Sequence, residues 1–389
     1  MKQIYLDHNA TTPVDPEVVE AMLPYFVSRF GNPSSVHYFG REAKVALENS
    51  REQVASFIKC KPTELFFTSG GTESDNIAIL GTAYRLRDRR KHIIIGASEH
   101  HAVLRPAEHL ACDEGFAVDY LPVDSEGFTS PEKLADLISE QTALVSVTHA
   151  NHETGTIQDI KSLTAVAHEK DVLFHTDAVQ SVGKLRVDVD DVGVDMLSLS
   201  GHKIYGPKGV GALFIRRGVL ISPLFHGGLH EKRRRPGTEN VAAVVGLAMA
   251  LEIAQRRLES DQRHLGELAD FLIEGAMGAI PDCHLNGPRK NRVPQTVNIS
   301  FHGVEGESVV LSLDAENVAV SSGSACTSGT GEPSHVLTAM GVPAVAAQGA
   351  IRFSLGRSTT KEDLKYVLEI LPRIIERLRA MSPVYNQGK

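Results

Sequence analysis

The chain has 389 residues, 42% of them hydrophobic, and a formal net charge of -8 at pH 7. A chain of this length exceeds what one hydrophobic core usually serves, so we expect a large domain and a smaller one. The acidic balance, with a pI of about 6.1, argues against a nucleic-acid-binding surface, and no nucleic-acid partner is expected.

The hydropathy pattern predicts no membrane segment. Lys2 and Asp7 appear before an apolar signal-peptide core could form, so we expect a cytoplasmic protein. The longest apolar stretch, residues 241–251, is shorter than the roughly 20 residues that a membrane span needs. It is expected to be a buried helix.

Helix and strand patterns alternate through the first part of the chain. Between residues 41 and 58 the apolar positions recur at intervals of three and four, as in an amphipathic helix. Short apolar runs predict strands at residues 65–68, 93–95, 117–121, 144–148, 172–175, 196–199 and 211–215. This alternation predicts an α/β fold with a mostly parallel central sheet.

The pattern changes beyond a long, charged helical stretch at residues 256–272. Strands are predicted at residues 297–301, 318–321 and 350–354, and a final helix at 361–379 that Thr360 and Asp363 would cap. We therefore expect residues 15–260 to form the large domain, and residues 1–14 and 261–389 to form a smaller α+β domain.

Three motifs lie next to predicted strand ends, where open α/β sheets bind ligands. Residues 69–73, Ser-Gly-Gly-Thr-Glu, would gather backbone amides at a helix N-terminus and could bind phosphate. Asp177 could keep a pyridinium nitrogen protonated, and Lys203 could form an imine with a carbonyl cofactor. Each motif alone has an ordinary alternative, namely a ligand-free turn, a helix cap or a surface lysine. Their combination favours a cofactor site.

Together, Ser-Gly-Gly-Thr72-Glu, His-Thr-Asp177-Ala-Val-Gln180 and Ser-Gly-His-Lys203 closely resemble the cysteine desulfurases of the class V aminotransferase family. The resemblance extends from Tyr5 to Arg357, nearly the whole chain. It implies a fold type I pyridoxal-phosphate enzyme and a homodimer, with a large domain that binds pyridoxal 5'-phosphate.

The resemblance also implies a role for each matching residue. Lys203 would hold the cofactor as an imine, Asp177 would pair with the ring nitrogen, and Gln180 would bond the ring oxygen. His100 would stack on the ring and handle protons, although the neighbouring His101 leaves the register open. The implied phosphate ligands are Gly71, Thr72, Ser200 and His202, with Thr238 reaching the phosphate of the other subunit.

Two further residues are implied to meet the substrate. Asn151 would lie near the ring and the substrate carboxylate, and the family often has a second asparagine where this chain has His152. Arg352 would bind the substrate carboxylate, which suits a planar guanidinium that makes two parallel hydrogen bonds.

Cys326 lies in residues 321–331, where small and polar residues predominate, and this composition indicates an exposed, reactive thiol. The other three cysteines, Cys60, Cys112 and Cys283, are expected to be buried and inert. No Cys-x-x-Cys or His-Glu-x-x-His pattern occurs, so no structural metal is expected, although Cys326 could briefly ligate a cluster iron.

The loop around Cys326 resembles the sulfur-accepting loop of the housekeeping and nitrogen-fixation desulfurases, and residues 332–337 lean toward the latter. The implied activity converts L-cysteine to L-alanine, with sulfur transferred to Cys326 as a persulfide. An iron-sulfur scaffold protein or another acceptor would then take the sulfur. The alternatives are a selenocysteine lyase or aminotransferase of the same class, which would not need Cys326, and a non-catalytic binding or scaffold protein on the same fold.

Overall fold

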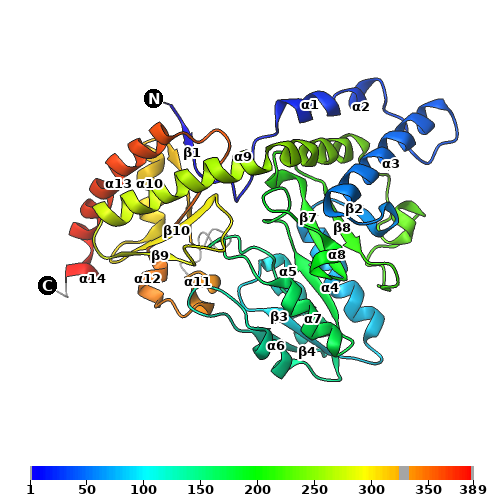
Figure 1. Ribbon diagram of the computed structural model, residues 1–389, viewed down its shortest axis with the longest axis horizontal. Helices are drawn as coiled ribbons and strands as arrows, with labels where there is room; N and C mark the ends of the chain where they lie inside the picture. Colours follow the sequence, from blue (N-terminus) through cyan, green and yellow to red (C-terminus); the bar gives the residue numbers. More distant parts are fainter. Residues whose placement is uncertain (1, 324–332, 387–389) are drawn as a thin grey trace.

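The computed structural model describes residues 2–323 and 333–386. The larger of its two cores is built around a seven-stranded sheet, whose strands are labelled in Figure 1. The strand order is β2-β8-β7-β6-β5-β3-β4. All strands are parallel except β8, which is antiparallel to both neighbours. The strands are β2 (Leu65–Thr68), β3 (His92–Gly96), β4 (Ala117–Leu121), β5 (Thr142–Ser146), β6 (Leu173–Asp177), β7 (Met196–Ser200) and β8 (Gly211–Ile215). The predicted mostly parallel α/β sheet is confirmed.

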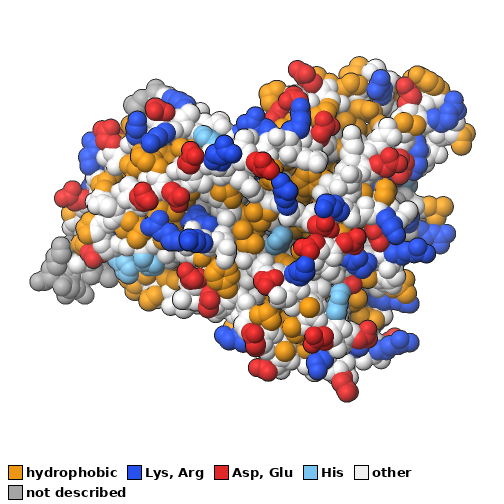
Figure 2. All heavy atoms as spheres, viewed as in Figure 1, with side chains coloured by type: hydrophobic (Ala, Val, Ile, Leu, Met, Phe, Trp, Pro, Cys, Tyr) orange, Lys and Arg blue, Asp and Glu red, His pale blue; other side chains and the backbone are white. Residues whose placement is uncertain are grey.

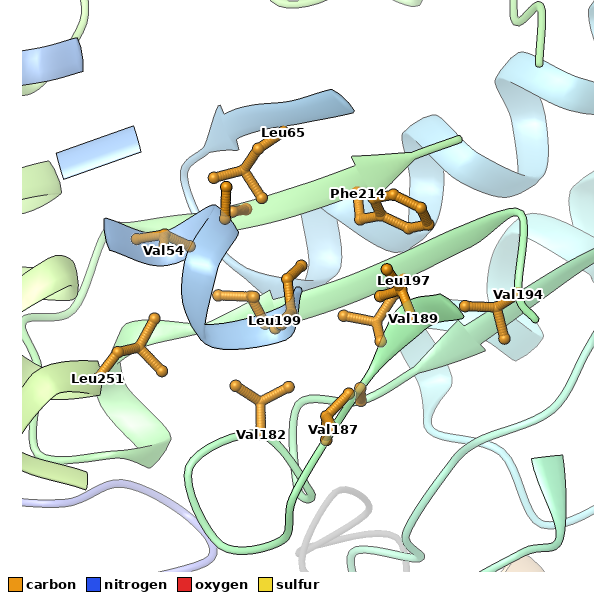
Figure 3. Close-up of a cluster of buried hydrophobic side chains, with 14 of the residues drawn as sticks. Val54, Leu65, Val182, Val187, Val189, Val194, Leu197, Leu199, Phe214 and Leu251 are labelled. Atoms are coloured by element: carbon orange, nitrogen blue, oxygen red, sulfur yellow. The ribbon is translucent and has the colours of Figure 1, made fainter. Parts of the chain in front are cut away.

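Helices cover both faces of this sheet because its strands are apolar on both sides. Leu65 and Phe67 of β2 belong to one buried cluster, and Phe66 between them belongs to the other. The first cluster, shown in Figure 3, includes side chains from α3 (Tyr38–Ile58), α7 (Ile160–Glu169) and the first half of α9 (Val241–Ala279). The second includes side chains from α4 (Gly71–Leu86) and α5 (His101–Asp113).

A second, smaller core surrounds an antiparallel sheet with the order β12-β13-β10-β9. Its strands are β9 (Cys283–Asn286), β10 (Thr296–Phe301), β12 (Ser321–Ser322) and β13 (Ala350–Ser354). Beside it, β1 (Ile4–Tyr5) pairs in parallel with β11 (Val318–Ala319), which brings the N-terminal segment to this part of the molecule. The predicted strand at 318–321 is thus divided between β11 and β12, and sequence patterns missed β1 and β9.

Helices α10 (Gly306–Ala315) and α13 (Lys361–Met381) pack on the smaller core, together with the second half of α9. The predicted capping box of α13 is confirmed, because Thr360 and Asp363 accept each other's backbone N–H. The remaining helices are α1 (Pro16–Met22), α2 (Pro24–Val27), α6 (Pro131–Leu137), α8 (Val189–Val192), α11 (His335–Ala339), α12 (Ala344–Gln348) and α14 (Pro383–Asn386).

Helix α9 joins the two cores. Sequence patterns predicted separate helical stretches at 241–251 and 256–272, but the structure has one helix of 39 residues. Leu247 near its start packs in the first core, and Leu272 near its end packs in the smaller core. The proposed boundary between residues 260 and 261 falls within this helix, and a division into domains there stays our proposal.

The cysteine predictions need one correction. Cys112 is exposed on α5, whereas Cys60 and Cys283 are half-buried. Burial raises the pKa of the Cys60 thiol to about 12, so this thiol stays protonated at neutral pH.

Among the described helices, none combines the length and the apolar character that a membrane crossing requires.

Candidate active site

A cavity of about 380 Å³ opens where the carboxyl ends of the parallel strands meet the N-terminal segment and β13. Parallel strands place their carboxyl ends at the same edge of a sheet, so residues far apart in sequence converge there. Strand β13, which belongs to the smaller antiparallel sheet, contributes Arg352. The predicted site residues that line the cavity are Gly71, Thr72, His100, Asp177, Gln180, Ser200, His202, Lys203 and Arg352.

Lys203 follows β7, and backbone carbonyls of the N-terminal segment hold its amine at the cavity. The Nζ atom donates to the carbonyl oxygens of Asn9, at 2.5 Å, and Ala10, at 2.8 Å. The amine of a lysine held in this way can reach a carbonyl carbon bound in the cavity. This placement suits an attachment point for a carbonyl cofactor.

Two buried carboxyl groups lie together on the cavity lining. Asp177 ends β6, and burial raises its pKa to about 6, whereas the Val179 N–H and the Lys203 charge act in the opposite direction. Burial and the neighbouring Asp177 raise the pKa of Asp75 well above its ordinary value. Oδ1 of Asp75 has no hydrogen-bond partner among the described residues. A pyridinium ring would place a further positive charge beside these two carboxyl groups.

The N-terminus of α4 forms the other end of the cavity. No side chain caps this helix, and Gly70 before it has a φ of 156°, which other residues rarely adopt. A Cβ atom at Gly71 would lie 2.7 Å from a methyl carbon of Val179, so only glycine fits. Ser200 lies beside this turn, and Nδ1 of His202 is 3.2 Å from the Thr11 hydroxyl. Uncapped amides with a hydroxyl and an imidazole nearby fit a phosphate group.

His100 occupies the N-cap of α5. Its Nδ1 accepts the Ala102 N–H at 3.0 Å, which places the proton of the neutral ring on Nε2. Burial, and next the charge of Lys203, lowers the pKa of His100 to about 4. His100 is therefore neutral at pH 7. His101 instead packs on His335, with ring centroids 4.8 Å apart.

Two predicted site residues, Asn151 and Thr238, do not line this cavity. Asn151 is buried outside the cavity lining, where its amide donates to the Ser98 carbonyl and accepts two backbone N–H groups of its own turn. Thr238 is exposed and lines a separate cavity of about 900 Å³. Cys326 lies outside the described residues. The roles of these three residues stay proposals.

Sequence reasoning missed Asp75 as a residue of the cavity. It considered His152 only as the residue that replaces the family's second asparagine. His152 is buried and lines the cavity, with its ring centroid 5.2 Å from that of His100 in an edge-on arrangement. Asp75 could have been predicted from its position one turn after Gly71 on the same helix. Nothing in the sequence indicated the backbone carbonyl groups of Asn9 and Ala10.

Comparisons with known proteins agree with this geometry. The Aminotransferase class-V family model matches residues 4–367. Cysteine desulfurase IscS of Dictyoglomus turgidum is 53% identical over 100% of this chain and 98% of its own length. Cysteine desulfurase NifS of Azotobacter vinelandii is 45% identical over 99% of this chain and 96% of its own length.

A solved structure of a NifS-like protein superimposes with a TM-score of 0.91, at 40% identity, over 97% of this chain and 100% of that one. The expected fold type I architecture is therefore confirmed. Together with a family match over almost the whole chain, this similarity leaves no doubt about the class of protein. The chain belongs to the class V aminotransferase family, and pyridoxal 5'-phosphate is its cofactor.

Proposed function

We propose that this protein is a cysteine desulfurase that converts L-cysteine to L-alanine and supplies sulfur for iron-sulfur cluster assembly. The observation that carries the proposal is the cavity in which Lys203, Asp177 and Arg352 converge. It occurs in a chain that matches cysteine desulfurases over its full length. An amine, a carboxyl group and a guanidinium are the groups that an amino-acid substrate and a pyridoxal cofactor require.

When bound, pyridoxal phosphate supplies a carbonyl carbon for attachment of amines and a ring that takes up the electrons left at the substrate α-carbon. Gly71, Thr72, Ser200 and His202 would hold its phosphate, and Asp177 would keep its ring nitrogen protonated. Lys203 would attach to it at rest, and its released amine would then remove the α-proton of the substrate. Arg352 would hold the substrate carboxylate.

Cys326 would take the sulfur. Its thiolate would attack the substrate sulfur, so a sulfur–sulfur bond forms on Cys326 while the bond from sulfur to the substrate Cβ breaks. The electron pair of the broken bond stays with the carbon skeleton, which becomes alanine after taking up protons. The resulting persulfide is then available to an acceptor protein, and we propose an iron-sulfur scaffold protein in this role.

We also propose that two copies of the chain associate through α1, α2 and the start of α3. Large apolar side chains are exposed there, and Figure 2 shows hydrophobic atoms gathered over these helices. They are Leu23, Phe26, Val27, Phe30, Val36, Tyr38 and Phe39. Exposed apolar patches of this kind mark protein–protein interaction sites. In such a dimer, the exposed Thr238 of one chain could reach the phosphate site of the other chain.

The test mixes the purified protein with cysteine and a reductant, and quantifies alanine and sulfide for the wild type and for Cys326→Ser. We expect equal amounts of alanine and sulfide from the wild type, and loss of sulfide release in the variant, which should keep the absorption of bound cofactor. Full activity of Cys326→Ser would favour a selenocysteine lyase or aminotransferase. A colourless protein that turns over nothing would favour a scaffold role.

Sedimentation measurements test the proposed association. We expect a dimer for the wild type and a shift toward monomer for the double variant Phe26→Asp/Phe30→Asp. A wild-type protein that stays monomeric at micromolar concentration would overturn the proposed interface. A double variant that remains fully dimeric would do the same.

A further inference from the structure

Lys184 is a partly buried lysine that lies behind the cavity lining and has an amide as its side-chain partner. Its Nζ donates to Oε1 of Gln180 at 2.6 Å, and its backbone carbonyl accepts the side-chain amide of Gln262 at 2.7 Å. Burial, followed by repulsion from Lys203 and Arg352, lowers the pKa of Lys184 to about 7. Among the described residues, no carboxylate compensates for its charge.

Two contacts give the Gln180 amide a single orientation. When protonated, the Lys184 amine only donates hydrogen bonds, so the atom that faces it is the oxygen Oε1. A backbone carbonyl only accepts, so the atom that faces Asn9 has to be the nitrogen Nε2, which donates to the Asn9 oxygen at 3.1 Å. Reversing the amide would place N–H groups against the ammonium and two oxygens against each other.

This orientation determines what Gln180 can offer to a bound ligand. An amide nitrogen carries two N–H groups, and the Asn9 carbonyl uses one of them. Gln180 also lines the cavity, so the second N–H is available there to an acceptor such as an anionic ring oxygen. Without Lys184, only the Asn9 carbonyl would hold the amide in this orientation.

We propose that Lys184 is a positioning residue, whose charge fixes and polarises the Gln180 amide so that it donates a hydrogen bond to the ring oxygen of the cofactor. The inference rests on the cofactor and on the proposed contact between Gln180 and its ring. Hydrogen bonds in a chain strengthen one another, so an ammonium on Oε1 makes the N–H a better donor. The chain continues to the reactive amine, since the Asn9 carbonyl also accepts from Lys203.

The test measures the dissociation constant of pyridoxal phosphate from the apoprotein, and the midpoint of the pH titration of the bound cofactor's absorption. Lys184→Met removes the charge at similar volume, and Gln180→Leu removes the amide. We expect Lys184→Met to weaken cofactor binding about tenfold and to shift the absorption midpoint. The double variant should bind no more weakly than Gln180→Leu, because Lys184 acts through Gln180.

Two further variants make the outcome specific. Lys184→Gln keeps a hydrogen-bond donor for Oε1 without the charge, and should bind the cofactor with intermediate affinity. The exposed Lys133→Met should bind like the wild type, and far-ultraviolet circular dichroism should show that all variants are folded. Wild-type affinity and an unshifted absorption midpoint in Lys184→Met would overturn the inference. A double variant whose loss of cofactor affinity equals the product of the two single losses would also overturn it. A wild-type protein that fails to bind pyridoxal phosphate would instead overturn the proposed function.

Discussion

Arg352 on β13 and Asp7 near the N-terminus form an ion pair, with 2.8 Å between Nη2 and Oδ1. The hydroxyl of Ser321 donates to the same carboxylate oxygen at 3.0 Å, and Nη1 of Arg352 donates to the His152 carbonyl at 3.3 Å. Three segments that are distant in sequence therefore hold one guanidinium at the cavity. Arg352 also lines the cavity, and its buried Nε has no hydrogen-bond partner among the described residues.

We predict that Arg352→Lys raises KM for cysteine about tenfold to a hundredfold, because lysine cannot form the two parallel hydrogen bonds that a guanidinium gives to a carboxylate. Steady-state alanine production measures KM, and the cofactor absorption should stay that of the wild type. A large loss of bound cofactor with an unchanged KM would contradict a role in substrate binding.

We predict that Lys203→Ala releases no alanine from cysteine yet still binds the cofactor through the phosphate and ring contacts. Borohydride reduction followed by mass spectrometry should show one covalently attached cofactor per wild-type chain and none on the variant. The exposed Lys208→Ala is the matched control, because it lies in the same turn but does not line the cavity. Normal turnover by Lys203→Ala would remove that lysine from its proposed role.

The sequence was sufficient to predict most of the cavity because its motifs lie at strand ends. The predicted bounds of β2, β4, β8 and β13 agree with the structure. Once the strands that precede the motifs, β2, β6 and β7, are placed parallel in one sheet, Thr72, Asp177 and Lys203 have to meet at one edge. No knowledge of side-chain packing is needed for that step.

The parts that could not be predicted depend on contacts between distant segments. The carbonyl groups of Asn9 and Ala10 hold Lys203, but backbone groups are alike in every residue and carry no sequence signal. The Lys184 contact with Gln180 depends on how one turn packs. The continuity of α9 was missed because residues near Arg256, between the two cores, are exposed and charged.

We predict that Glu153→Gln stabilises the apoprotein above neutral pH but not in mild acid. Burial raises the pKa of Glu153 to about 7, and Ser334, whose hydroxyl lies 2.5 Å from its carboxylate, acts in the opposite direction. Between the unfolded pKa near 4.5 and the folded value near 7, the folded state binds more protons than the unfolded state. Stability should therefore fall as pH rises through this range.

Urea unfolding of both proteins at about pH 5 and about pH 8 measures this effect as the difference in their free energies of unfolding. The difference should be about 1 kcal/mol or less at the lower pH and reach roughly 3 kcal/mol in favour of Glu153→Gln at the higher pH. Glu140→Gln, at an exposed position, should show no such trend. A difference that does not change with pH would rule out a titrating Glu153.

We predict that Arg51→Met destabilises the protein by about 3 to 5 kcal/mol, because it leaves the buried carboxylate of Glu231 without its cation. Arg51 donates to both oxygens of Glu231, at 2.8 and 2.6 Å, and the Phe67 N–H donates to one of them at 2.9 Å. Glu231, Lys232 and Arg233 have positive φ angles of 43°, 55° and 68°. The ion pair therefore holds a strained segment that leads to Thr238.

Because the cost comes from an uncompensated charge, Arg51→Met/Glu231→Gln should be less destabilised than Arg51→Met alone. Urea unfolding of the two single variants and the double variant measures this coupling. The exposed pair of Arg186 and Glu259, with 2.7 Å between Nη2 and Oε1, provides the control, since Arg186→Met should cost no more than about 1 kcal/mol. If Arg51→Met were as mild as Arg186→Met, the segment before Thr238 would need another anchor.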